Sequence, residues 1–239
     1  MNSEDQLSIF DKIVTRSPTD QSGTPTNTNL AGNFDLIPTI SSVPIPAGTY
    51  SSISQLAGHC ESCHRCGLGD TRINAVVGRG NQQAQILIIG EGPGQNEDEQ
   101  GLPFVGRSGQ LLEKILASVK LSVDRDVYIC NVVRCRPPEN RVPTPAEIAA
   151  CKPYLLEQIR LVDPKIILLT GATAVKAITG KKEGITKIRG TWIEWEGRLC
   201  MPIFHPAYLL RNPSPESGKP KWLMWQDIQL IKAKLDELS

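Results

Sequence analysis

The stretch Gln85-Ile-Leu-Ile-Ile-Gly-Glu-Gly-Pro-Gly94 decides the fold, because it joins a short apolar run to a glycine-rich turn. Consecutive Ile and Leu residues bounded by polar and glycine residues predict a strand over Gln85–Ile89, buried on both faces as in a parallel sheet. Three later segments repeat this pattern and predict further strands: Val127–Val133, Lys165–Thr170 and Leu199–Phe204.

Helices are expected between these strands. Ser108 can cap a helix whose apolar stripe runs from Leu111 to Val119, and Thr144-Pro-Ala-Glu147 is a capping box that opens a helix toward Val162. Two more are expected: Gly171–Ile178 and a C-terminal helix with an apolar stripe from Trp222 to Leu238. Strands that alternate with helices predict an α/β fold, here a three-layer α/β/α sandwich around a four-stranded parallel sheet.

In open parallel sheets, ligands bind beyond the carboxyl ends of the strands. Three segments rich in glycine or polar residues follow the predicted strands at that edge: Gly90–Gly94, Asn131–Arg136 and Phe204–Arg211. We therefore expect these segments to surround one crevice.

The composition indicates one domain with an appendage. Residues 1–50 are rich in Ser, Thr, Asn, Pro and Gly without a sustained apolar period, so we expect a disordered N-terminal tail followed by one folded domain over residues 51–239. No apolar run approaches the roughly 18 residues that a membrane span needs, and the N-terminus lacks a secretory pattern, so a cytoplasmic protein is expected.

Charge and cysteine content constrain the partners. After residue 50 the chain holds 24 of its 26 Lys and Arg side chains but only 20 of its 25 Asp and Glu side chains, a balance that permits a DNA partner. Seven cysteines in a chain of cytosolic character favour metal ligands and buried thiols over disulfides.

The glycine-rich segment does not fit either common nucleotide motif. A dinucleotide fingerprint starting at Gly90 would need glycine where Gln95 stands, and the near phosphate loop over Gly101–Ser108 has Arg107 in place of the lysine.

The cysteine spacing favours an iron-sulfur cluster over zinc. Cys60, Cys63 and Cys66 are separated by two residues each, while Cys135 and Cys151 stand alone and do not repeat the close pair of a zinc ribbon. Four thiolates are enough for a cluster, whereas Cys130 and Cys200 lie in predicted strands as ordinary buried thiols.

Four motifs in order resemble the family 4 uracil-DNA glycosylases, the iron-sulfur branch of that superfamily, from about Cys63 to the C-terminus. The motifs are Gly90-Glu-Gly-Pro-Gly94 with Glu97-Asp98, Gly101-Leu-Pro-Phe-Val-Gly106, Asn131-Val-Val-Arg-Cys-Arg-Pro-Pro-Glu-Asn-Arg141 and His205-Pro-Ala-Tyr-Leu-Leu-Arg211. The resemblance implies a DNA-repair glycosylase that flips uracil out of single- or double-stranded DNA and hydrolyses its N-glycosidic bond.

The resemblance also implies roles for single residues. The uracil pocket would be formed by Glu91, Gly92, Phe104, Asn131 and His205. Phe104 would stack on the base, Asn131 would recognise its O4 and N3-H, and His205 would stabilise its O2 during cleavage. The catalytic carboxylate stays open between Glu91 and Glu97, because Gly92 stands where several relatives have an aspartate.

For the cluster, the family pattern Cys-x-x-Cys-x-Leu-x-x-x-Arg selects Cys63, Cys66, Cys135 and Cys151 as ligands of a [4Fe-4S] cluster and leaves Cys60 as a spare. The cluster is expected to pin remote segments and to shape the loop Arg134–Arg141 near the DNA backbone. In the last motif, Leu209 or Leu210 would fill the space vacated by the flipped base and Arg211 would bind a phosphate.

Other expectations concern partners and alternatives. Gln6, Leu7, Ile9 and Phe10 resemble the peptide that bacterial proteins present to the replication sliding clamp, and a monomer is expected. One sister subfamily crosslinks itself to DNA through a histidine, but Arg136–Arg141 contains none, so we expect turnover. A uracil sensor without cleavage and an iron-sulfur regulator are the competing functions.

Overall fold

The computed structural model describes residues 44–238, and the proposed clamp-binding residues Gln6, Leu7, Ile9 and Phe10 lie outside them. At its centre is a six-stranded sheet in the order β1-β3-β2-β4-β6-β5. Its strands are β1 (Arg79–Gly80), β2 (Ile86–Gly90), β3 (Val127–Asn131), β4 (Ile166–Thr170), β5 (Ile193–Trp195) and β6 (Arg198–Ile203).

The four strands expected from the sequence form the middle of this sheet, and neighbours among them pair in parallel. The registers place Gly90 opposite Asn131 and Thr170 opposite Ile203, which brings the carboxyl ends of the strands to one edge. Every residue of β2, β3 and β4 is buried, because helices cover both faces of the sheet.

The expectation of a purely parallel, four-stranded sheet is wrong at the edges, where β1 and β5 pair antiparallel with β3 and β6. These strands have only two and three residues, too few to show an alternating pattern. A tight turn beside β5 is the one local sign of an edge strand in the described residues. Glu196 and Gly197 have φ values of 46° and 75°, the conformation of a two-residue hairpin turn between β5 and β6.

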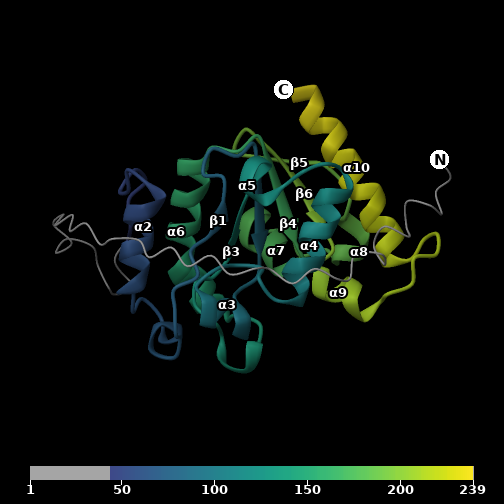
Figure 1. Cartoon of the computed structure of the whole chain (residues 1–239). Helices are drawn as coiled ribbons and strands as arrows, with labels where there is room; N and C mark the ends of the chain where they lie inside the picture. Colours follow the sequence, from purple (N-terminus) through teal and green to yellow (C-terminus); the bar gives the residue numbers. More distant parts are fainter. Residues whose placement is uncertain (1–43, 239) are drawn as a thin grey trace, which may run out of the picture. The chain divides into compact units, whose positions relative to one another are not determined.

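Helices lie on both sides of the sheet (Figure 1). They are α2 (Ile53–Glu61), α3 (Gln95–Gln100), α4 (Arg107–Ser118), α5 (Val123–Asp126), α6 (Pro145–Val162), α7 (Ala172–Thr179), α8 (Ile185–Ile188), α9 (Pro206–Arg211) and α10 (Pro220–Leu238), with 3-10 turns over Gly67–Asp70 and Pro138–Asn140. α2 packs on α6, while α4 packs on α9 and α10. The predicted capping box of α6 is confirmed: Thr144 Oγ1 accepts from the Glu147 N–H at 3.2 Å, and the Thr144 N–H donates to Glu147 Oε2 at 2.7 Å.

The folded part begins before the expected boundary at residue 51. Ile45 and Tyr50 are buried, and the N–H groups of Gly48 and Tyr50 donate to the Glu157 carboxylate of α6 at 2.8 and 3.1 Å. The composition of this segment gave no sign that it packs on the fold. The carboxylate that binds it comes from more than 100 residues later in the chain.

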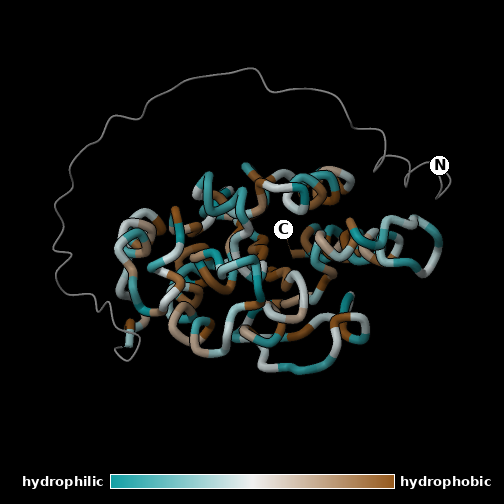
Figure 2. Tube along the Cα trace, turned by 90° about the horizontal axis from the view of Figure 1, so that it is seen from below, coloured by the Kyte–Doolittle hydropathy of each residue, from teal (hydrophilic) through white to brown (hydrophobic). Residues whose placement is uncertain are grey.

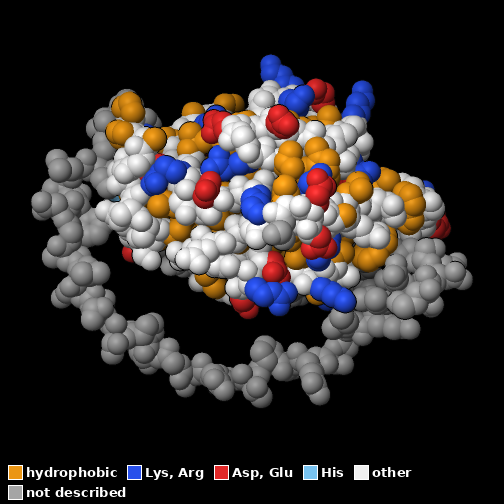
Figure 3. All heavy atoms as spheres, turned by 90° about the horizontal axis from the view of Figure 1, so that it is seen from above, with side chains coloured by type: hydrophobic (Ala, Val, Ile, Leu, Met, Phe, Trp, Pro, Cys, Tyr) orange, Lys and Arg blue, Asp and Glu red, His pale blue; other side chains and the backbone are white. Residues whose placement is uncertain are grey.

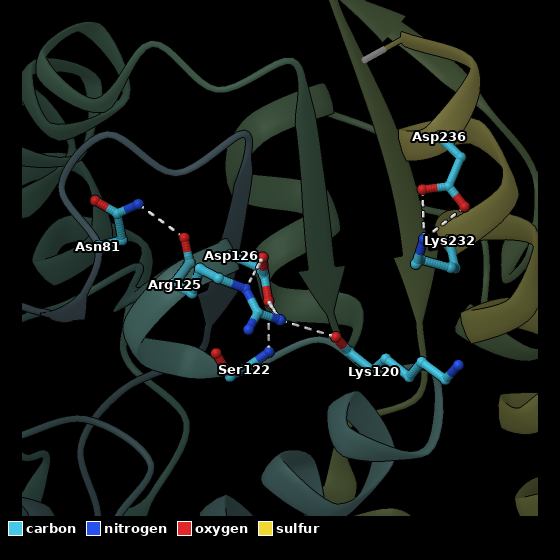
Figure 4. Close-up of polar contacts among 7 residues, drawn as sticks. All are labelled: Asn81, Lys120, Ser122, Arg125, Asp126, Lys232 and Asp236. Atoms are coloured by element: carbon cyan, nitrogen blue, oxygen red, sulfur yellow. Dashed lines mark hydrogen bonds and ion pairs between the residues drawn. The ribbon is translucent and has the colours of Figure 1, made fainter.

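A polar network lies at the amino end of β3, around α5 (Figure 4). The Ser122 N–H donates to Asp126 at 2.7 Å, Arg125 pairs with Asp126 at 2.9 Å, and the Asn81 amide donates to the Arg125 carbonyl at 2.8 Å. On this side of the molecule, acidic and basic side chains are interspersed (Figure 3), so no field of a single sign gathers there. No helix within residues 44–238 is long and apolar enough to cross a membrane.

Candidate active site

A cavity of about 740 Å³ lies at the carboxyl edge of the sheet, and segments after β2, β3, β4 and β6 line it. Figure 2 views the molecule from this edge, with hydrophobic segments gathered in the middle. All six uracil-pocket and carboxylate candidates line the cavity: Glu91, Gly92, Glu97, Phe104, Asn131 and His205. These residues come from distant parts of the sequence, and they meet at one cavity, as we expected from their positions after the predicted strands.

Asn131 and Phe104 form the floor of the cavity beside Gly90. A Cβ at position 90 would lie 2.3 Å from Asn131 Oδ1 and 2.6 Å from the Phe104 ring. Any residue other than glycine would therefore displace these two side chains. Asn131 lies at the end of β3, where it is 2 % exposed and lines the cavity. Its amide can both donate and accept a hydrogen bond, so it can recognise a polar ligand there.

The Phe104 backbone is held in an unusual conformation. Its φ is 55°, which disfavours a bulky side chain, and Arg79 fixes the turn by donating to the Pro103 carbonyl at 2.7 Å and to the Phe104 carbonyl at 2.8 Å. Gly109 is also required, because a Cβ there would overlap the Phe104 carbonyl. These contacts fix the backbone that carries the ring, and the centroid of the Phe104 ring lies 5.7 Å from that of the His205 ring.

The hydrogen bonds of His205 define its tautomer. His205 is the N-cap of α9, and its Nδ1 accepts from the Ala207 N–H at 3.1 Å. Because Nδ1 accepts, the proton of the neutral ring resides on Nε2, which has no partner among the described residues. The side chain thus presents one hydrogen-bond donor to the cavity that it lines.

His205 is neutral at physiological pH. Burial, and to a smaller extent the positive charge of Arg211, lower its pKa to about 4 against the opposing effect of Glu97. A neutral donor next to a basic side chain suits a ligand atom that gains negative charge.

The two carboxylates have different surroundings. Glu91 follows β2 and accepts a hydrogen bond from the Thr173 hydroxyl at the start of α7. Glu97 lies in α3, where Oε1 accepts from the N–H groups of Val105 and Gly106 at 3.0 and 2.8 Å and Oε2 accepts from Gly94 at 3.2 Å. Glu97 therefore clamps the chain that carries Phe104.

Position 92 has no space for a carboxylate. A Cβ there would lie 2.9 Å from Val133 Cγ2 and within 4 Å of Pro137 and Pro143. The glycine is therefore required by close packing of the loop that follows β3.

The three DNA-contact candidates, all in α9, differ in how exposed they are. Leu209 is 1 % exposed and belongs to the core, whereas Leu210 is 36 % exposed. Arg211 lines the cavity together with Tyr208 of the same helix. Burial thus argues against Leu209 as a wedge and leaves Leu210 as the candidate.

Five cysteines surround a second cavity, between α2, the Gly67–Asp70 turn, the end of β3 and α6. These are Cys60, Cys63, Cys66, Cys135 and Cys151. Cys60, which was set aside as a spare, is buried and lines this cavity. Cys130 and Cys200 do not line it and lie buried in β3 and β6, as expected of ordinary thiols.

Cationic and hydroxyl groups point at the sulfur atoms. Arg72 donates to Cys135 Sγ at 3.2 Å, Arg134 donates to Cys151 Sγ at 3.7 Å, and the Tyr154 hydroxyl donates to Cys63 Sγ at 3.3 Å. Arg72 also holds the Cys63 carbonyl at 2.8 Å. These donors can balance negative charge on sulfur, whereas burial raises the pKa of the Cys135 thiol to about 12 against the effect of Arg72.

Arg134 corrects one expectation. It was placed in a loop near the DNA backbone, but it is 2 % exposed, bonded to the Val132 carbonyl and to Gln158, and its Nε has no partner. No carboxylate pairs with it within residues 44–238. A buried guanidinium needs a compensating negative charge, and the cavity lined by cysteines is where that charge can reside.

No group of three or more His, Cys, Asp or Glu side chains within the described residues is arranged to hold a single metal ion. The exposed His64 is bonded to Asp70 at 2.7 Å instead. The cysteines enclose a space between them rather than converging on one point.

Comparisons with known proteins agree on one family. The model of the uracil DNA glycosylase superfamily matches residues 77–229. The chain belongs to this superfamily. It is 48 % identical over 175 residues to the type-4 uracil-DNA glycosylase of Thermotoga maritima, covering 72 % of this chain and 89 % of that protein. It is 42 % identical over 172 residues to the type-4 enzyme of Sulfurisphaera tokodaii, covering 68 % and 78 %.

The match to the superfamily confirms the family expected from the four motifs, and the matched range contains every residue that lines the cavity. Sequence reasoning missed several lining residues, among them Thr170, Thr173, Asn140, Val142 and Ile185. Val142 is 61 % exposed at the cavity, beside Arg141, which is paired with Glu147 at 2.7 Å. Pro137, Pro138 and Pro143 flank these residues in the sequence, and they could have indicated a rigid rim of the cavity.

Proposed function

We propose that this chain is a type-4 uracil-DNA glycosylase that hydrolyses the N-glycosidic bond of deoxyuridine, releases uracil and leaves an abasic site. The observation that carries this proposal is the Nε2 donor of His205, which lines the same cavity as Phe104 and the Asn131 amide. The family membership supports it, since the relatives are named for this activity.

Recognition follows from the floor of the cavity. The target nucleotide must leave the base stack to reach it, which costs a few kcal/mol in duplex DNA and less in a single strand. Stacking on Phe104 returns about 1 to 3 kcal/mol. The Asn131 amide can donate to uracil O4 and accept from N3-H, whereas cytosine would leave both groups mismatched.

Cleavage leaves negative charge on the departing uracil. His205 donates from Nε2 to O2 as this charge develops, and its fixed tautomer means that no proton has to be rearranged first. Glu97 acts by holding the chain that carries Phe104, while Glu91 keeps a carboxylate near the sugar position. With glycine at 92, excision depends more on stabilising uracil than on activating water.

The cysteine cavity fits an iron-sulfur cluster. Cys63, Cys66, Cys135 and Cys151 would hold a [4Fe-4S] cluster, and Arg72, Arg134 and Tyr154 would balance the charge on the sulfurs. When bound, the cluster supplies four iron-thiolate bonds that tie the Cys63–Cys66 segment to the loop after β3 and to α6. Because that loop also lines the uracil cavity through Pro137 and Asn140, its anchorage supports the site.

The proposal includes a monomer in the cytoplasm that acts on single- or double-stranded DNA, with the clamp as a partner through the N-terminal peptide. It also includes turnover without a covalent adduct, since Arg136–Arg141 offers no nucleophilic histidine. A DNA adduct that persists on a denaturing gel would refute that last part.

The test is strand scission after alkali treatment of an oligonucleotide with one uracil. The chain should cleave it, His205→Ala should be slower by roughly 100-fold or more, and Lys232→Ala on the remote α10 helix should equal the wild type. Tight binding without scission would identify a uracil sensor, and neither binding nor scission would favour a regulator that uses the cluster.

A further inference from the structure

A cavity that needs four thiolates is lined by five. Cys60 is 2 % exposed and lines it with Cys63, Cys66, Cys135 and Cys151. Arg134 lines this cavity as well, so Cys60 shares it with the other cysteines and with a cationic side chain.

Arg134 provides an independent indication of a ligand at this place. Its side chain is almost fully buried and lines the same cavity, and its Nε is buried without a hydrogen-bond partner within residues 44–238. Cys60 therefore lines the cavity in which the buried Arg134 guanidinium requires a negative charge.

Cys60 is placed to replace one ligand in particular. It occupies the last turn of α2, and the Cys63 N–H donates to its carbonyl at 3.3 Å, so the two residues are one helical turn apart. Cys66 lies three residues further along the chain, at the start of the Gly67–Asp70 turn, and so does not share the helical turn of Cys60. Cys63 is also more exposed than Cys60, and an exposed thiolate is the one that an oxidant reaches first.

We propose that Cys60 is a reserve ligand for the iron-sulfur cluster, which takes the iron site of Cys63 when the Cys63 thiolate is lost. In the exchange, the Cys63 sulfur would leave the iron and take up a proton, and the Cys60 thiol would release a proton and bind the vacated iron through its sulfur. No electron is transferred. This inference rests on the proposed cluster.

The test measures iron and acid-labile sulfide per chain, with the visible absorbance, in full-length variants purified without oxygen. Cys63→Ala should keep most of the wild-type iron, whereas Cys66→Ala should lose it. The decisive pair is Cys60→Ala/Cys63→Ala, which should lose the cluster, and Cys63→Ala/Cys130→Ala, which should keep it because Cys130 does not line the cavity. Circular dichroism establishes that each variant is folded.

A second measurement leaves all four primary ligands in place. Cys60→Ala should carry as much iron as the wild type but lose it faster when titrated with hydrogen peroxide. Equal rates of loss, or a folded Cys63→Ala chain as iron-free as Cys66→Ala, would overturn the reserve role while leaving the cluster intact. A wild-type chain without iron would overturn both, and uracil excision by the same preparation reports separately on the proposed activity.

Discussion

His205 shows how one hydrogen bond determines chemistry at the scale of a residue. The Ala207 N–H occupies Nδ1, so the proton resides on Nε2 and points the only donor of the neutral ring into the cavity. Sequence placed the histidine after a strand but could not define its tautomer, since that depends on the cap geometry of α9.

The pH dependence of excision should report this environment. Because burial and Arg211 lower the pKa of His205 to about 4, against Glu97, the acid limb that this residue contributes to the single-turnover rate should lie near pH 4 rather than 6.5. Arg211→Gln should move that limb upward, whereas Arg198→Gln on remote β6 should leave it in place. A wild-type midpoint at 6.5 would contradict the buried, neutral ring.

The same group affects stability with a defined sign. Between pH 4 and 6.5 the unfolded chain binds a proton at His205 that the folded chain does not, so this contribution to the free energy of unfolding falls as pH decreases through that window.

At the scale of an element, α3 and the turn after it depend on Glu97. Glu97→Gln keeps an acceptor for the Val105 and Gly106 N–H groups and loses only the bond to Gly94, whereas Glu97→Ala loses all three. We expect single-turnover excision to fall much less in Glu97→Gln than in Glu97→Ala. Equal loss in both would indicate that the carboxylate charge itself acts on water.

α9 supports a prediction about neighbouring leucines. Leu209→Ala should lower the free energy of unfolding by about 2 to 5 kcal/mol, as a core cavity does, in urea denaturation. The exposed Leu210→Ala should keep stability and slow excision from duplex DNA, where a gap must be filled, with little effect on single strands. Equal slowing on both substrates would exclude the wedge role.

At the scale of the whole molecule, Glu157 joins the start of the described chain to α6. Burial raises its pKa, but hydrogen bonds from Arg160, Gly48 and Tyr50 outweigh this effect and hold the pKa below its usual value. The carboxylate therefore stabilises the fold above the unfolded pKa of about 4.3, and this contribution is lost as pH falls through the lower folded value.

Glu157→Gln should accordingly lower the free energy of unfolding by about 1.5 to 3 kcal/mol at pH 7, with a smaller difference from the wild type near pH 3. Urea denaturation at both pH values measures this, with the exposed Glu194→Gln on β5 as the control. A difference that does not depend on pH would mean that shape, not charge, orders residues 44–50.

The sequence by itself determined the central strands, the capped helices, the family and the residues that meet at the carboxyl edge, because apolar period, capping residues and motif spacing are local properties of the chain. Edge strands β1 and β5, the docked segment before residue 51, the burial of Arg134 and Leu209, and the five-cysteine cavity required the tertiary structure. Each depends on a partner from a distant part of the sequence. Glu157 binds the N–H of Gly48, and the packing of α2 on α6 brings Cys60 and Cys151 to the same cavity.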